Sequence, residues 1–139
     1  MKQIEIKIEK SYDFVRFLSM SGFSVEDLGN DIYSVQRDEE LPVYVKVDDE
    51  VVYFEVDLGN VSSIASQDLY FKFLDLNTEI LPVSLGINNA NPEDPRLVLV
   101  ESRETSNLND HEILSVFDAM ELAVEKIEPV LHSFVATNV

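Results

Sequence analysis

Residues that could perform catalysis are scarce in this sequence of 139 residues. Its two histidines are His111, in the first turn of the last predicted helix, and His132, near the end of the chain. A histidine works as a general base when a second group holds it in position, and the sequence pattern offers neither one such a partner. There is no cysteine, which excludes thiol catalysis, thiolate metal sites and disulfides. We therefore expect no catalytic residue and no enzyme.

Carboxylates are plentiful, with 27 Asp and Glu residues against 10 Lys and Arg residues. The run from Asp48 to Glu50 suits a hairpin turn, and it lacks the glycine and the twelfth-position glutamate of a calcium-binding loop. Glu93 and Asp94 lie near three asparagines and could hold a weak cation, although a solvated loop is the simpler interpretation. We expect no metal site and no cofactor. The alternative is a small-molecule or divalent-cation-dependent module that uses these surface carboxylates.

A small-molecule module would need an apolar pocket, and aromatic side chains are its usual lining. Tyr33, Tyr44, Tyr53 and Phe54 are the candidates for such a lining. Phosphate-binding loops are absent from the sequence, because no two of its four glycines are close enough to cradle a phosphate. The Gly-x-Ser-x-Gly motif of serine hydrolases is absent as well.

The formal net charge of −17 is the strongest global property of the chain. A field of this sign repels phosphate backbones and anionic lipids, so we expect no nucleic-acid binding. The acidity either keeps the protein in solution or attracts a basic partner. The opening residues MKQIEIKIEK hold no continuous apolar segment, and no window approaches 18 uninterrupted apolar residues. We therefore expect no secretory signal, no membrane insertion and, given the missing cysteines, a cytoplasmic protein.

The length of the chain is that of one domain, and its 45% hydrophobic content is enough for a buried core. We find no internal repeat and no linker-like change in composition. Residues 1–139 are therefore predicted to form a single domain.

The first half of the chain predicts one helix followed by strands. Residues 10–20 carry apolar side chains on one face and are followed by Gly22, which is typical of the end of a helix. Residues 23–60 contain a short apolar run from Ile32 to Val35, a run from Val43 to Val47 with a period of two, and a further strand-like run from Val51 to Val56. Three strands in an antiparallel meander are the simplest interpretation.

Residues 62–77 fit a helix better than a strand, with Ser62 or Ser63 as its cap. The stretch from Leu69 to Leu76 is apolar on almost every side, which is typical of a helix buried against two surfaces. Burial in the core explains Leu69, Phe73 and Leu76. Tyr70, Phe71 and Leu74 are then left on the other faces, and an exposed apolar surface of this size usually marks an interface. The candidate homodimer interface consists of Leu69, Tyr70, Phe71, Phe73 and Leu74.

The second half predicts two strands and a long helix. Residues 81–87 and 97–100 are the strands, joined by a loop rich in turn residues. Asn109 is followed by Glu112 at the spacing of a capping box, and apolar residues then recur at steps of three and four as far as Phe134. Pro129 lies inside this pattern, so we expect a kink or an early end of the helix there.

The predicted order is helix, three strands, helix, two strands and long helix, which is an α+β fold. This order resembles class I type III secretion chaperones and YbjN-like proteins over the whole chain. The second half, residues 65–134, also resembles the YjfI-type family of uncharacterised bacterial proteins. That likeness rests on Leu76-Asn77, on the run LPVSLGI that starts at Leu81, on the apolar strand and on the long acidic helix.

These resemblances imply a bacterial, cytoplasmic protein with a chaperone-like or adaptor role and no active site. Secretion chaperones of this architecture commonly form homodimers and bind a protein partner. We therefore expect a non-catalytic domain that dimerises and binds a protein still to be identified.

Overall fold

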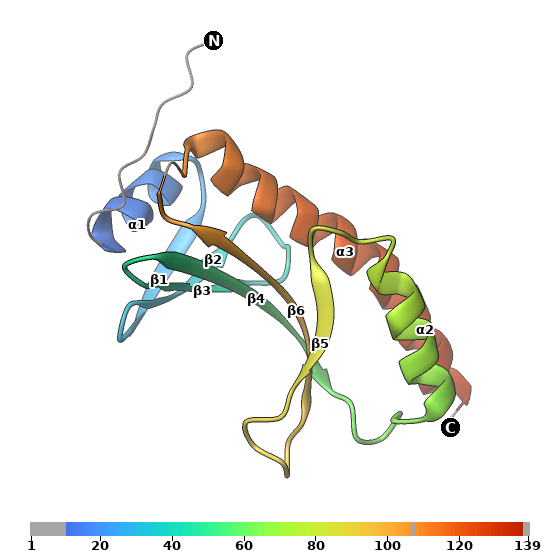
Figure 1. Cartoon of the computed structure of the whole chain (residues 1–139). Coiled ribbons are helices and arrows are strands. Elements are labelled where there is room, and N and C mark those ends of the chain that lie inside the picture. The colour runs from blue at the N-terminus through green and yellow to red at the C-terminus, as the bar shows by residue number, and fades with distance from the viewer. Residues whose placement is uncertain (1–10, 107, 138–139) are drawn as a thin grey trace. The chain divides into compact units, whose positions relative to one another are not determined.

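The computed structural model describes residues 11–106 and 108–137 (Figure 1). It is an α+β fold with a six-stranded sheet in the order β1-β2-β3-β4-β6-β5, and β1 to β4 are joined to one another as antiparallel pairs, as are β5 and β6. The predicted fold class is thereby confirmed. The opening ten residues, on which the expectation of no secretory signal depends, lie outside the described residues. The elements are α1 (Ser11–Met20), β1 (Ser24–Gly29), β2 (Ile32–Gln36), β3 (Val43–Val47), β4 (Val51–Asn60), α2 (Gln67–Asn77), β5 (Ser84–Asn88), β6 (Arg96–Glu104) and α3 (Asp110–Thr137).

The described residues form two compact units. The first unit contains the chain up to Val56 together with Glu101–Asp118, and the second contains Asp57–Val100 together with the chain from Ala119 onward. Strands β4 and β6 and helix α3 each run from one unit into the other. Each unit is described by itself below.

The core of the first unit is built around phenylalanine rings. Phe14 of α1 and Phe54 of β4 have ring centroids 6.3 Å apart. Phe117 of α3 meets Phe54 edge-to-face at 5.8 Å and contacts Phe23 at 4.7 Å. Such tilted and edge-to-face pairs are favourable because the positive ring edge meets the negative ring face. The alternating valines of β3 add a buried row, since every second side chain of a strand points to the same side.

Helix α1 confirms the first predicted helix. Phe14 and Leu18 are fully buried because residues four apart lie on the same helix face. Met20, the last residue of the helix, is 78% exposed. The helix ends as predicted: Gly22 has a φ of 91°, and the Phe23 N–H donates to the Leu18 carbonyl at 3.1 Å.

The three-strand meander was wrong by one strand, because β1 precedes it. Strand β1 pairs with β2 in antiparallel register and forms one end of the sheet order. Its sequence, SVEDLG, has no alternation of apolar residues, and five of its six residues are exposed. An edge strand of this kind leaves no period-two signal, so the pattern that identified the other strands could not identify this one.

In the second unit, residues 67–77 form a helix as predicted, but its cap was assigned to the wrong serine. The Ser66 hydroxyl accepts a hydrogen bond from the Leu69 N–H at 3.1 Å, so Ser66 is the cap in place of Ser62 or Ser63. The following strand also starts later than expected. Residues 78–83 form turns and β5 begins at Ser84.

Helix α3 begins at the predicted cap, where the Asn109 side chain accepts from the Glu112 N–H at 2.9 Å. Its apolar stripe is buried from Ile113 to Ile127. Pro129 does not end the helix, which continues to Thr137. The expectation of an early end was therefore wrong.

Candidate functional site

Helix α2 separates the candidate interface residues into a buried and an exposed group. Leu69 is fully buried and Phe73 is 5% exposed, so these two belong to the core of the second unit. Tyr70 is 38% exposed, Leu74 69% and Phe71 75%. Spacing explains the division, because residues four apart share a helix face and the residues between them point elsewhere. The role of these five residues as a homodimer interface stays a prediction. We call Tyr70, Phe71 and Leu74 the α2 outer face.

Helix α2 carries three charged side chains, Asp68, Lys72 and Asp75, and the last two form a loose ion pair. Lys72 and Asp75 lie 3.9 Å apart on the helix, with side chains 47% and 61% exposed. A pair so exposed adds little stability, since water and salt screen it. The α2 outer face is therefore apolar surface next to one loose ion pair.

Two more exposed leucines belong to the same unit. Leu81 follows α2 and is 70% exposed, and Leu122 of α3 is 60% exposed. The Lys126 Nζ, one helical turn beyond Leu122, donates to the Glu79 carbonyl at 3.2 Å. This contact ties α3 to the turn that leads from α2 to Leu81.

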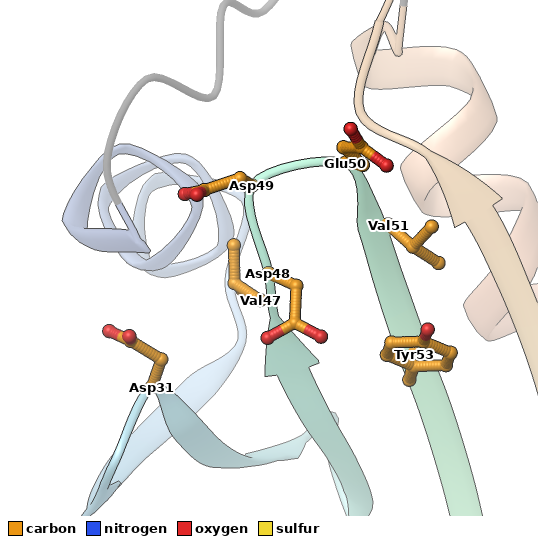
Figure 2. A pocket seen from close by; sticks show the side chains of 7 residues that line it. All are labelled: Asp31, Val47, Asp48, Asp49, Glu50, Val51 and Tyr53. Carbon is orange, nitrogen blue, oxygen red and sulfur yellow. The ribbon is translucent and has the colours of Figure 1, made fainter.

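An open acidic pocket of about 470 Å³ lies in the first unit, at the turn between β3 and β4 (Figure 2). Asp31, Asp48, Asp49 and Glu50 line it together with Tyr53 and two valines. The turn itself is held by hydrogen bonds from the Thr105 N–H to the Glu50 carbonyl and from the Thr105 hydroxyl to the Asp49 carbonyl, both 2.8 Å. Within residues 11–106 and 108–137, no three Asp, Glu or His side chains are arranged to hold a metal ion.

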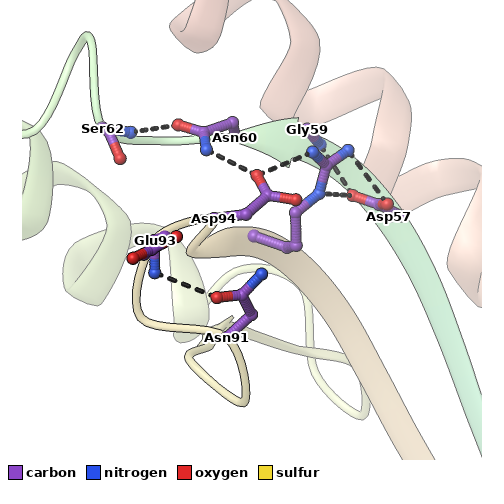
Figure 3. A network of polar contacts seen from close by, with 8 residues as sticks. Asp57, Gly59, Asn60, Ser62, Asn91, Glu93 and Asp94 are labelled. Atoms are coloured by element: carbon purple, nitrogen blue, oxygen red, sulfur yellow. Dashed lines mark hydrogen bonds and ion pairs between the residues drawn. The ribbon is translucent and has the colours of Figure 1, made fainter.

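The loop that was considered for a weak cation, against the simpler interpretation of a solvated loop, uses its aspartate internally (Figure 3). The Asp94 carboxylate accepts from Asn60 Nδ2 at 2.6 Å and from Arg96 at 3.2 Å. These bonds favour the charged form and hold the pKa of Asp94 below its ordinary value. Arg96 also binds both carboxylate oxygens of Asp57, at 3.1 and 3.2 Å, which raises the pKa of its guanidinium. Asp94 thus already has a cationic partner within the protein.

The four aromatic residues proposed to line a pocket do not share a face of the sheet. Val45 of β3 lies opposite Tyr33 on one side and Phe54 on the other, and both aromatics are buried with it. Tyr44 and Tyr53 alternate with these buried residues along β3 and β4, and they are 37% and 47% exposed. These four candidate residues therefore do not line one common pocket.

The two histidines lie on exposed positions of α3, so the structure brings neither His111 nor His132 into a buried cluster. No helix in the described part of the chain is both long enough and apolar enough to cross a membrane.

Sequence reasoning missed a buried charged group on β6. Glu101 is 8% exposed, and its Oε1 accepts from Arg103 Nε at 2.9 Å and from Arg103 Nη2 at 2.8 Å. The other oxygen, Oε2, is buried, and no group in the described part of the chain forms a hydrogen bond with it. The sequence signal for the burial of Glu101 is weak: the glutamate directly follows the apolar run Leu97–Val100, at a point where the strand continues into less buried positions.

Comparisons with known proteins agree with this architecture. A chain of the heterodimeric complex ExoU–SpcU, from the type III secretion system of Pseudomonas aeruginosa, is 19% identical with a TM-score of 0.65, and the match covers 82% of this chain and 93% of that one. YbjN from E. coli is 12% identical with a TM-score of 0.69, and the match covers 94% of this chain and 97% of that one. Identities this low show a shared fold and no more.

A comparison with curated protein sequences finds no match. The family model CesT_Tir_1 matches residues 7–137, which is nearly the whole chain. Because this match covers far more than half of the chain, this chain belongs to the CesT_Tir_1 family of type III secretion chaperones.

Proposed function

We propose that this chain is a non-catalytic, chaperone-like protein of the cytoplasm that works as a homodimer and binds a protein partner. Family membership supports the chaperone-like role. The similar chain in the ExoU–SpcU complex is part of a protein heterodimer, which supports a protein partner here as well. The observation that carries the homodimer is the α2 outer face, where Phe71 and Leu74 are 75% and 69% exposed.

Exposed apolar side chains on one short helix favour a protein contact. Removing such side chains from water stabilises association by about 25 cal/mol for each Å² buried. A stable interface buries roughly 800 Å² on each partner, which is more than three side chains provide. We therefore include Leu81 and Leu122, which are exposed and belong to the same unit.

The charge of the chain sets the salt dependence expected of this homodimer. Each copy carries a formal net charge of −17, so two copies repel one another. Salt screens that repulsion and leaves the apolar contact in place. The homodimer should accordingly become stronger as ionic strength rises, whereas a contact made by ion pairs would become weaker.

Sedimentation velocity over a range of concentrations tests the homodimer. The double variant Phe71→Ser/Leu74→Ser should sediment as a monomer at concentrations where the wild type is dimeric. Met20→Ser is the matched control, because Met20 is 78% exposed on α1 and lies outside the proposed surface. A wild type that is monomeric at tens of micromolar, or a double variant that still dimerises, would contradict the proposed interface.

The protein partner is tested by purification of the tagged chain from its native cells, with chemical cross-linking before lysis and mass spectrometry of the products. We expect one protein in stoichiometric amounts, cross-linked to the same surface residues in replicate preparations. A chain that purifies with no stoichiometric protein from cells that contain its partners would contradict the chaperone-like role while leaving the homodimer result untouched.

Two further predictions accompany this proposal. The resemblance of residues 65–134 to the YjfI-type family stays a prediction. The single domain over residues 1–139 is supported by the continuation of β4, β6 and α3 through both units. Calorimetry should give one cooperative transition whose calorimetric and van't Hoff enthalpies agree, and two separate transitions would contradict it.

The alternative of a small-molecule or divalent-cation-dependent module has less support. The acidic pocket offers no set of metal ligands in the described part of the chain. Asp94 is bound to Arg96, and the candidate aromatic residues lie on two faces of the sheet.

A further inference from the structure

Asn77, the last residue of α2, hydrogen-bonds to both main-chain polar groups of one residue in β5. Its Oδ1 accepts from the Leu85 N–H at 2.6 Å, and its Nδ2 donates to the Leu85 carbonyl at 3.3 Å. A carboxamide side chain offers one acceptor and one donor, as a peptide group does. Asn77 therefore binds Leu85 in the way that a residue of a neighbouring strand would.

These bonds establish which backbone groups of β5 point away from β6. In an antiparallel pair, successive residues alternate between bonding to the neighbouring strand and pointing away from it. The Leu85 N–H and carbonyl are bound to Asn77, so they point outward, and the groups of Ile87 must do the same. Strand β5 ends the sheet order, and Ile87 is 45% exposed. The outer edge of β5 is thus occupied at Leu85, and within residues 11–106 and 108–137 no hydrogen bond reaches the outward groups of Ile87.

Strand β5 carries no charged side chain, no proline and no bulge, although it is short and contacts α2. Proteins protect sheet edges with charged side chains, prolines within the strand or bulges, because unpaired backbone groups attract another strand. No charged residue occurs from Ile80 to Pro92, although 27% of the chain is charged. A Cβ added to Gly86 would meet no atom within 4 Å. In a chain of net charge −17, this uncharged stretch adds no like-charge repulsion of its own towards a second copy.

A twofold axis at Gly86 would suit the pairing of two β5 strands. Antiparallel strands in that register place Leu85 of each copy opposite Ile87 of the other, so the outward groups of both residues would be paired. The two Gly86 residues would meet at the centre, where a missing side chain allows close approach. With Asn77 bound to Leu85 in both copies, neither of these pairs can form.

We propose that Asn77 is a positioning residue that closes the edge of β5 and so prevents β5 from pairing with β5 of a second copy. The side chain replaces, within the chain, the hydrogen bonds that an intermolecular strand would make. The Asn77–Leu85 contact is separate from the homodimer proposed through the α2 outer face. By closing the β5 edge, it leaves the α2 outer face as the surface through which two copies associate.

The test compares Asn77→Ala with Asn77→Ala/Ile87→Pro by sedimentation velocity and infrared spectroscopy. Removing the carboxamide opens Leu85, so Asn77→Ala should show an additional association step, about a doubling of mass over the wild type, with more intermolecular β-sheet signal. Proline at position 87 has no N–H to donate, and that N–H points away from β6, so the double variant should return to the wild-type mass. The α2 outer face is unchanged in both variants. A missing α2 homodimer would therefore lower the mass of the wild type and of both variants alike, whereas the β5 pairing appears as an increase in Asn77→Ala alone.

Two results would overturn the proposal: a folded Asn77→Ala variant with the wild-type mass, or an increase in mass that persists in the double variant. If Asn77→Ala does not fold, amide hydrogen exchange of the wild type decides. The Leu85 amide should exchange at least about tenfold more slowly than the Ile87 amide, because only the former is hydrogen-bonded. Equal exchange rates would overturn the proposal.

Discussion

Phe71 and Phe73 are two residues apart on α2, yet Phe71 is 75% exposed and Phe73 only 5%. Two residues of an α-helix turn the side chain to the opposite side. Phe73→Ala should lower the free energy of unfolding by about 3–4 kcal/mol, because it removes buried apolar surface and leaves a cavity. Phe71→Ala should change it by less than about 0.5 kcal/mol under conditions where the protein is monomeric. Urea denaturation measures both, and similar losses for the two variants would show that α2 is placed differently.

The cap of α2 gives a prediction that separates two serines. The Ser66 hydroxyl accepts from the Leu69 N–H, whereas Ser62 is bonded through its N–H to Asn60 Oδ1. Ser66→Ala should therefore lower the free energy of unfolding by about 1 kcal/mol. Ser62→Ala keeps its main-chain bond and should have an effect close to zero. Urea denaturation in parallel would detect the difference, and a larger loss at Ser62 would restore the earlier helix start that the sequence had indicated.

The hydrogen bonds of Asp94 predict a pH effect with a definite sign. Asn60 and then Arg96 hold the pKa of Asp94 below its ordinary value in the folded protein. The folded state therefore keeps this carboxylate charged at pH values where the unfolded chain takes up a proton. The resulting stabilisation is present above the unfolded pKa, and it is lost as the pH falls below about 4, through the folded pKa.

Removal of the first hydrogen bond tests this cause directly. Asn60→Ala should raise the pKa of Asp94 towards its ordinary value, and NMR titration of the side-chain carboxyl carbon measures it. Asn89→Ala, in the exposed loop after β5, is the control and should leave the titration unchanged. An unaltered pKa in Asn60→Ala would mean that Arg96 alone is responsible.

From the Glu101–Arg103 pair we predict that removal of the partly exposed Arg103 side chain lowers the free energy of unfolding. The Glu101 side chain is 4% exposed and the Arg103 side chain 32%. Arg103→Ala leaves a buried carboxylate without its partner, which should lower the free energy of unfolding by about 2 kcal/mol, below the loss for a fully buried pair. Arg16→Ala, on the exposed side of α1, should have little effect. Equal effects in urea denaturation would mean that water or another donor compensates Glu101.

Local sequence was sufficient for the elements whose signals repeat. Helix α3 was predicted from its cap at Asn109 and from its apolar stripe. Both signals are local, because the cap bonds to the first N–H groups of the helix and the stripe repeats every three or four residues. Strand β3 was predicted from the alternation of its valines with polar residues, and β4 from the run that starts at Val51 after a polar turn. Strand β1 was not, because an exposed edge strand needs no buried row.

For α2, burial in the core explained Leu69, Phe73 and Leu76 from the sequence, although Leu69 and Phe73 were also placed in the candidate interface. Which apolar residues then stay exposed depends on what the rest of the chain covers, and the structure answers that with Phe71 and Leu74.

By itself, the sequence determined the helices, most strands, the strong negative charge and the absence of thiol chemistry, because each of these depends on composition or on residues a few positions apart. Only the tertiary structure placed Asn77 on the edge of β5, Arg96 between Asp57 and Asp94, and Glu101 beside Arg103 in a buried position. The first two join different elements, and the burial of the third depends on the packing around it. Such arrangements follow from how the chain packs, and no local pattern of residues encodes them.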